Sequence, residues 1–378
     1  MNAGEQSRPA KKKRASRAST FHVVTVVWGK AYLDLFLDVC VPNQCTAGNL
    51  GALPPGSRYR LLTTPAGADV LAQSPALLRL RAFVPVDIVS LPELALPTVS
   101  PLARMTAAHC RALADANEPG AALIFLNADH FLSEGALSAV VRLHRTGMRV
   151  IATPGIRLDR DAFVGALNAG GAVRSLSSRH LVALALEHLH PFTLAHMADA
   201  PSAASAPISV YWRLPAGMLV RSFHLHPLMV DPVRRDIVPK GTIDGDYVAR
   251  CCPDHDEIHV VADSDELTLF ELTEREGATT DRRRGGISLW RAAAMMSRCD
   301  DLQAAYWRRP TRIHGEDIGR GWEIVERRAA RFAACVSASR RFGAWLLRCP
   351  AASSVCGSER RNSRSGSGLA PSRLAASA

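Results

Sequence analysis

A polar turn follows the most apolar short run of the chain. The run 121–126 (AALIFL) has the composition of a buried strand, and the turn 127–130 (NADH) comes directly after it. In sheets of alternating strands and helices, ligands bind outside the carboxyl ends of the parallel strands. A carboxylate at Asp129 would face such a crevice and suits a divalent metal, because hard cations prefer oxygen ligands. The alternative is a structural role, in which Asp129 caps the helix expected from Glu134 or shapes the turn.

Two histidines share one face of a later extended segment. Residues 223–230 have the pattern of a strand, and the period of two places His224 and His226 on the same side. Imidazole nitrogens at this spacing could both coordinate a metal. The other interpretation is that they are ordinary core or surface histidines.

Two acidic turns could also carry chemistry. The segment 242–246 (TIDGD) places Asp244 and Asp246 on either side of a glycine, which suits a hard cation or the recognition of a hydroxyl group. A solvated turn is equally compatible with this segment. The segment 263–266 (DSDE) also follows a strand, and there helix capping competes with a functional role.

These residues need a sheet to position them, and the apolar pattern predicts one. Segments rich in β-branched or aliphatic residues lie at Val23–Val27, Arg60–Thr63, Leu123–Leu126 and Arg149–Ala152, and stretches with helical periodicity separate them. This alternation predicts an α/β fold, with a mostly parallel central sheet flanked by helices.

The same pattern divides the chain into four parts. Residues 1–20 form a basic arm without apolar periodicity, which we expect to be disordered. Residues 21–275 form the α/β domain. Residues 276–345 form a helical C-terminal extension, whose tryptophans, Trp290 among them, we expect to pack helices together. Residues 346–378 are rich in Ser, Gly and Arg, and we expect a disordered tail there.

The positive charge of the chain lies at its two ends. The net charge is +11, but residues 21–330 contain 32 basic and 33 acidic residues and are close to neutral. A body without excess positive charge argues against specific nucleic-acid binding. The two basic ends, in contrast, could adhere weakly to nucleic acid or anionic lipid.

Several common sites are missing from the sequence. It contains no GxGxxG or GxxxxGK[ST] loop, no GxSxG elbow and no HExxH helix, which disfavours dinucleotide, P-loop, acyl-hydrolase and zincin functions. The nine cysteines form no CxxC pair, and the apolar runs are far too short for a membrane span. We therefore expect a cytoplasmic chain with reduced thiols and no transmembrane segment.

The order of these parts resembles that of the GT-A class of glycosyltransferases, the nucleotide-diphospho-sugar transferases. The likeness covers about residues 21–270. Its motif is the segment 126–133 (LNADHFLS), which is similar to the DxD strand end of that class, with Asn127 in place of the first Asp. In that class the motif binds Mn²⁺ or Mg²⁺ together with the diphosphate of a sugar nucleotide, and a later His or acid often completes the metal site.

The resemblance implies a role for each candidate residue. Asp129 and His226 would hold the metal, and Asn127 would contact the donor. Asp244 or Asp246 would act as the base on the acceptor side. The residues that would surround the nucleoside lie in two turns at strand ends: Trp28, Gly29, Tyr32, Thr63 and Thr64.

Three functions remain open on the sequence alone. The first is a transferase that uses a sugar nucleotide and an unknown acceptor, with a carboxylate that deprotonates the acceptor hydroxyl. The second is a non-catalytic protein that binds a nucleotide or glycan on the same scaffold; Asn127 favours it, because an amide is a weaker metal ligand than a carboxylate. The third is a metal-dependent hydrolase that uses His224, His226, Asp244 and Asp246 and binds metal without any nucleotide.

Overall fold

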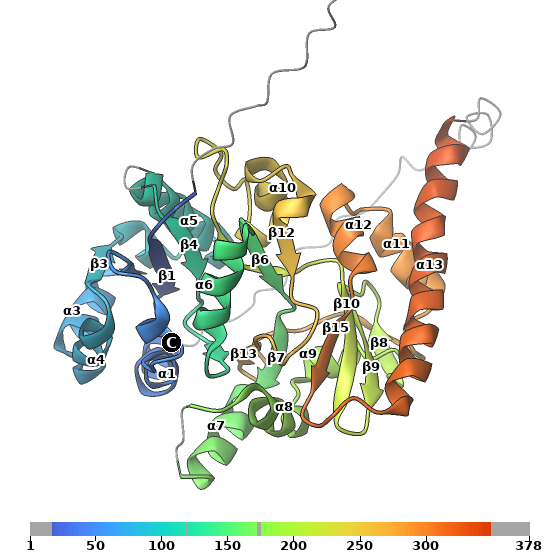
Figure 1. Ribbon diagram of the computed structural model, residues 1–378, viewed down its shortest axis with the longest axis horizontal. Coiled ribbons are helices and arrows are strands. Elements are labelled where there is room, and N and C mark those ends of the chain that lie inside the picture. Colours follow the sequence, from blue (N-terminus) through green and yellow to red (C-terminus); the bar gives the residue numbers. More distant parts are fainter. Residues whose placement is uncertain (1–16, 118–119, 172–174, 349–378) are drawn as a thin grey trace, which may run out of the picture.

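The computed structural model describes residues 17–117, 120–171 and 175–348, with side chains up to Ser339. Its centre is a seven-stranded sheet in the order β12-β6-β11-β4-β1-β2-β3 (Figure 1). The strands are β1 (Phe21–Val27), β2 (Arg58–Thr63), β3 (Val86–Ser90), β4 (Ala122–Phe125), β6 (Val150–Thr153), β11 (His226–Val230) and β12 (Ile258–Val260). Neighbouring strands are parallel, except that β11 runs antiparallel to β4 and β6. The predicted α/β fold with a mostly parallel sheet is confirmed.

Helices cover both faces of this sheet. Val23 and Val27 of β1 belong to one buried cluster, and Val24 and Val26 belong to the other, because successive strand residues point to opposite faces. On the first face lie α1 (Lys30–Leu35), α2 (Val41–Gln44), α3 (Pro65–Gln73), α4 (Pro75–Phe83) and α6 (Ala136–Thr146). On the second lie α5 (Pro101–Asn117), α10 (Val248–Cys251) and α12 (Asp301–Arg308). Burial on both sides explains why the central strands are apolar throughout.

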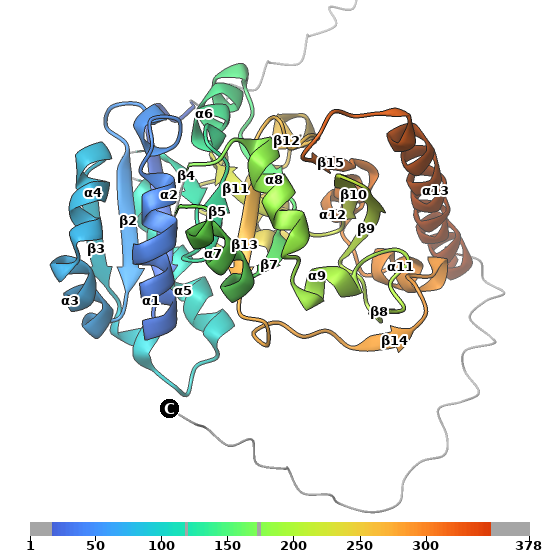
Figure 2. The same cartoon turned by 90° about the horizontal axis from the view of Figure 1, so that it is seen from below.

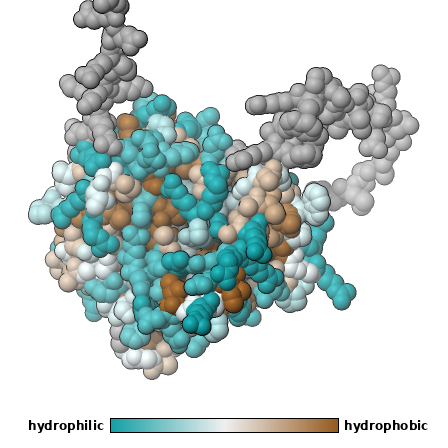
Figure 3. All heavy atoms as spheres, turned by 45° about the vertical axis from the view of Figure 1, so that its right-hand side comes forward, coloured by the Kyte–Doolittle hydropathy of each residue, from teal (hydrophilic) through white to brown (hydrophobic). Residues whose placement is uncertain are grey.

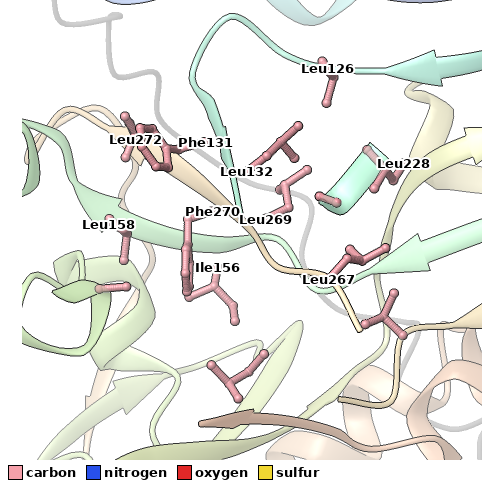
Figure 4. Packing of buried hydrophobic residues seen from close by; sticks show 14 of the residues in the cluster. Leu126, Phe131, Leu132, Ile156, Leu158, Leu228, Leu267, Leu269, Phe270 and Leu272 are labelled. Atoms are coloured by element: carbon pink, nitrogen blue, oxygen red, sulfur yellow. The ribbon is translucent and has the colours of Figure 1, made fainter. Parts of the chain in front are cut away.

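A small sheet in the order β5-β13-β7 lies beside the central one. Its strands are β5 (His130–Leu132), β13 (Leu269–Thr273) and β7 (Ile156–Asp159). Figure 4 shows Phe131, Ile156 and Phe270 of these strands among the buried apolar side chains. The ring of Phe131 also packs edge-on against Phe163 of α7 (Arg160–Ala169), with ring centroids 5.4 Å apart. The opposite face carries His130, Arg157 and Glu271 together with the buried Leu132 and Leu269.

The rest of the chain forms a second group of elements, seen on the right of Figure 2. A three-stranded antiparallel sheet has the order β15-β10-β9, and a two-stranded one joins β14 to β8. Their strands are β8 (Ser202–Ala204), β9 (Ser209–Leu214), β10 (Gly217–Ser222), β14 (Arg282–Arg284) and β15 (Thr311–His314). The helices here are α8 (Ser178–Glu187), α9 (Pro191–Ala195), α11 (Leu289–Met296) and α13 (Arg320–Arg348).

The C-terminal region differs from the helical extension predicted over 276–345. It also contains β14 and β15, and each of these pairs with a strand from before residue 276. The helix α13 runs on to Arg348, past the predicted boundary. Strands of three or four residues show too little of the period-two pattern to be recognised, and their pairing partners lie far away in the sequence.

The described part of the predicted N-terminal arm contacts the body. Arg17 donates a hydrogen bond to the carbonyl oxygen of Gly147 (3.0 Å), and the backbone N–H of Ala18 donates to Asp231 (3.2 Å). Residues 1–16 and 349–378, which make up most of the two predicted disordered ends, lie outside the described residues. Across the described ranges, no helix combines the length and the apolar character that crossing a membrane requires.

Candidate functional site

A cleft opens at the carboxyl ends of β1 and β4, and it consists of two adjoining cavities. The first, here called the tryptophan cavity, has a volume of about 540 Å³ and is lined by Trp28, Tyr32, Asn127 and Asp129. The second, the histidine cavity, has a volume of about 210 Å³. Its polar lining comes from elements far apart in the sequence: His109, Asn127, Arg157, His224, His226, Asp244 and Glu271. Asn127 lines both cavities and stands between them.

Hydrogen bonds fix the turn that carries Asn127 and Asp129. The backbone N–H of Asn127 donates to Nδ1 of His130 (3.1 Å), and the N–H of His130 donates to the carbonyl oxygen of Asn127 (3.1 Å). A third bond, from the N–H of Leu272 to the carbonyl oxygen of Asp129 (2.8 Å), ties the turn to β13. The apolar strand β4 ends in this turn, so its polar side chains come out at the cleft.

Asp129 lies in surroundings that disfavour its charged form. Burial raises the pKa of Asp129 to about 7, and the nearby carboxylate of Glu271 adds to the shift. Glu271 stands directly opposite His130 on β5 and Arg157 on β7. Arg157 partly compensates this negative charge, because its Nε donates to Glu271 Oε2 at 3.1 Å. Asp129 and Glu271 therefore bring two carboxylates to this part of the cleft, and Arg157 pairs with Glu271.

Burial favours the neutral form of three histidines around the histidine cavity. Burial lowers the pKa of His109 to about 4 and lowers the pKa values of His130 and His226 as well. Nε2 of His226 donates to the carbonyl oxygen of Phe125 (2.8 Å), because a carbonyl oxygen can only accept. That bond leaves Nδ1 as the only ring atom of His226 that could coordinate a metal.

Aromatic side chains form one wall of the tryptophan cavity. The guanidinium of Arg104 on α5 lies over the ring of Trp28, 5.2 Å from its centroid. Tyr32 on α1 is 41% exposed, and burial together with Asp129 raises the pKa of its hydroxyl. Gly29 between them lines neither cavity; its φ of 81° lets the chain turn from β1 into α1. Such a wall suits the flat face of a nucleobase.

Thr63, Thr64 and Asp246, three other predicted site residues, also line neither cavity. Thr63 is fully buried at the end of β2, and the Thr64 hydroxyl caps α3 by accepting from the N–H of Gly67 (3.0 Å). Asp246 accepts from Arg250 (3.3 Å) at the surface. The backbone kink at Gly245 turns Asp244 and Asp246 in different directions, and of the two, Asp244 lines the histidine cavity.

Sequence reasoning did not single out Glu271, Arg157, His109 or His130. The signal for Glu271 is present in the sequence, since it interrupts the otherwise uncharged strand 269–273 (LFELT). A charge within a buried strand is costly unless a partner or a ligand compensates it. Nothing in the local pattern indicates that Arg157 is that partner.

Of the residues that the structure describes, one group of three possible metal ligands has its ligand atoms within 4.8 Å of one another: Asp263, Asp265 and His314. The group lies outside the cleft, and its polar atoms satisfy one another. His314 donates from Nδ1 to the carbonyl oxygen of Glu316 (2.7 Å), and its Nε2 lies 2.8 Å from Oδ1 of Asp263, while Arg179 pairs with Asp265 (2.8 Å). It acts as an ion network that ties α8 to β15. Asp129 and His226 do not belong to it.

Comparison with known proteins adds little to this geometry. Neither a protein-family model nor a curated protein matches the sequence. Two solved structures that are similar in part are both of S. aureus TarS. One, of residues 1–349, is 9% identical, covers 36% of this chain and 35% of its own, and has a TM-score of 0.26. The other is 8% identical, covers 76% of this chain and 39% of its own, and has a TM-score of 0.31. The chain thus spans well under half the length of either structure, and the case for a function rests on the cleft residues.

Proposed function

We propose that the cleft binds a sugar nucleotide and that the protein transfers the sugar to a hydroxyl group of an acceptor. One observation carries this proposal. Asn127 and Asp129 at the end of β4 share a cleft with His226 and Asp244, which come from segments about a hundred residues further along the chain. They meet at the edge where sheets of this type bind their ligands.

The donor would lie across both cavities. Its base would stack in the tryptophan cavity on Trp28 and Tyr32, which places the diphosphate beside Asn127 and Asp129. Asp129 and Glu271 would hold Mn²⁺ or Mg²⁺, which when bound offsets the negative charge of the leaving diphosphate. Arg157 would hold Glu271 in place through their ion pair.

The acceptor would lie in the histidine cavity. Asp244 would take the proton from its hydroxyl group as general base. The neutral rings of His109 and His226 would provide hydrogen bonds to polar groups without adding charge. The small volume of this cavity, about 210 Å³, favours one sugar ring or a comparable part of a larger acceptor.

A non-catalytic binding protein is the second candidate, and Asn127 favours it. An amide at the position between the two cavities gives a weaker metal site than a carboxylate does. Such a protein would bind the sugar nucleotide without consuming it. A metal-dependent hydrolase, the third possibility from the sequence, would bind metal tightly with no nucleotide present.

A panel of sugar nucleotides tests these possibilities. The full chain would be melted with each compound, with and without Mn²⁺, and a rise in melting temperature for one nucleotide class supports the shared donor site. Release of free nucleoside diphosphate on adding acceptor sugars then separates transfer from binding alone. D129N is the test variant, and D69A, which removes an exposed carboxylate on α3 that lines neither cavity, is its matched control. No shift with any sugar nucleotide would contradict the proposal.

A further inference from the structure

One tryptophan is on the surface although the sequence predicted it to pack helices. Trp290 at the start of α11 is 85% exposed, and its neighbour Leu289 is 43% exposed. Trp307 and Trp322 are buried, as expected. Trp290 and Leu289 together expose contiguous apolar area, and it is contiguous area of this kind, rather than a single side chain, that marks interaction sites.

Arginines precede and follow this tryptophan in the chain. β14 consists of Arg282, Arg283 and Arg284, and all three are exposed. From residue 281 to residue 291 the chain contains four arginines and a single acid, Asp281. Within the described ranges, no carboxylate forms an ion pair with any of the four. The segment therefore presents uncompensated positive charge next to exposed apolar area; we call residues 282–290 the arginine–tryptophan patch.

The patch is held rigidly on the body. β14 pairs with β8, and Arg291 donates to the carbonyl oxygens of Arg284 (3.2 Å) and Gly286 (3.3 Å). Gly286 packs so tightly on the backbone of Ala198 that a methyl group would overlap the Ala198 carbonyl oxygen. Figure 2 shows β14 at the edge of the molecule with α11 next to it. Apolar and hydrophilic residues also alternate across the side of the molecule that Figure 3 presents.

We propose that the arginine–tryptophan patch docks the protein on an anionic lipid bilayer. Tryptophan prefers the headgroup level of a membrane, where its ring is in a partly apolar layer and its N–H stays hydrated. Arginines beside it pair with lipid phosphates and are drawn to a negative surface. With no spanning helix among the described residues, the association is peripheral.

Nucleic acid is the competing partner for such a patch, and the structure favours lipid. Non-specific binding of single strands uses several aromatic rings on which successive bases stack. Here one tryptophan stands beside an exposed leucine, which contributes apolar area and no stacking face. The proposal concerns the folded body and is independent of the basic ends of the chain and of the sugar-nucleotide site.

The docking proposal is tested by measuring how the full chain binds to lipid vesicles. The protein would be floated with vesicles of phosphatidylcholine alone and with vesicles containing about a third phosphatidylglycerol. We expect binding to the anionic vesicles only, weakened about tenfold by W290A and about a hundredfold by the triple variant R282A/R283A/R284A. The matched controls are L78A and R79A/R81A on α4, where Leu78 is 68% exposed.

A second measurement reports on Trp290 itself. Brominated lipids in the vesicles should quench part of the tryptophan fluorescence of the wild type, and W290F should lose that part. Because Trp290 is exposed, W290A and W290F should have the same melting temperature as the wild type. Anionic-vesicle binding that is the same in W290A, the triple variant and the wild type would overturn the proposal and assign adhesion to the ends. Loss of single-stranded oligonucleotide binding in these variants, with vesicle binding intact, would overturn it in favour of nucleic acid.

Discussion

Glu271 of β13 and Arg157 of β7 face each other across the small sheet, with Arg157 Nε 3.1 Å from Glu271 Oε2. The same glutamate stands opposite His130 on β5 and raises the pKa of Asp129. The two residues are far apart in the sequence. Their ion pair places one positive and one negative group in the lining of the histidine cavity.

The two acids of the 244–246 turn should differ in their effect on transfer. D244N should lower kcat by about two to four orders of magnitude, because it removes the proposed base and keeps the shape of the side chain. D246N should leave kcat within about twofold, since this residue pairs with Arg250 outside the cleft. Steady-state kinetics with the donor found in the panel provides the measurement. Equal losses in both variants would remove Asp244 from its assigned role.

Asp129 should be required for the donor and for the metal. We expect D129N to weaken Mn²⁺-dependent binding of the sugar nucleotide at least tenfold without lowering the free energy of unfolding, because burial and the carboxylate of Glu271 both disfavour the charge that the variant removes. Calorimetric titration with and without a chelator measures the first effect, and denaturant melts measure the second. Donor binding that survives both the variant and the chelator would mean that no metal takes part.

Gly155 should be needed because of its closeness to Glu271. A methyl group at residue 155 would overlap Oε1 of that glutamate and push it from its place opposite Arg157. We expect G155A to raise the Kd for the donor several-fold and to cost no more than about 1 kcal/mol of stability, because only the end of the Glu271 side chain has to move. Titration and denaturant unfolding measure the two quantities. G165A on α7, where a methyl group has open space, is the control and should leave both nearly unchanged.

The buried His109 predicts a loss of stability in acid. Its pKa in the folded protein is about 4, below the ordinary value of 6.5, so the unfolded chain binds the proton more tightly. The effect of His109 on the free energy of unfolding is therefore most favourable above pH 6.5. As the pH falls from 6.5 towards 4, this residue lowers the free energy of unfolding by up to about 3 kcal/mol. In H109L the free energy of unfolding should fall less steeply over this interval. H180Q, at an exposed histidine, should reproduce the wild-type slope.

Asp231 should be among the most sensitive positions for stability. It is fully buried at the end of β11, where it accepts from His144 (3.2 Å), Arg149 (2.9 Å) and Arg235 (3.0 Å). D231N would remove the negative charge that faces the buried Arg149 and His144, and we expect it to cost about 3–5 kcal/mol in urea unfolding. D87N breaks a more exposed pair with Arg58 and should cost less than about 1 kcal/mol. Similar losses in both variants would show that burial does not set the cost.

The sequence by itself determined the central sheet and the place of Asp129. Val23–Val27 and Leu123–Leu126 are apolar throughout, because both faces of the sheet are covered, and local composition is enough to reveal this. A polar turn after such a strand must lie at its carboxyl end. The position of Asn127 and Asp129 at the cleft follows from these two facts.

The residues that share the cleft with Asp129 were decided by the tertiary structure alone. His226 reaches the carbonyl oxygen of Phe125 across 101 positions of sequence, because β11 enters the sheet antiparallel between β4 and β6. Glu271 reaches the cleft because β13 pairs with β5 and β7, and Trp290 is exposed because α11 turns its other face to the core. Strand order and the choice of helix face depend on the summed packing of many distant side chains. Local periodicity records only which residues are apolar, so it could not indicate these contacts.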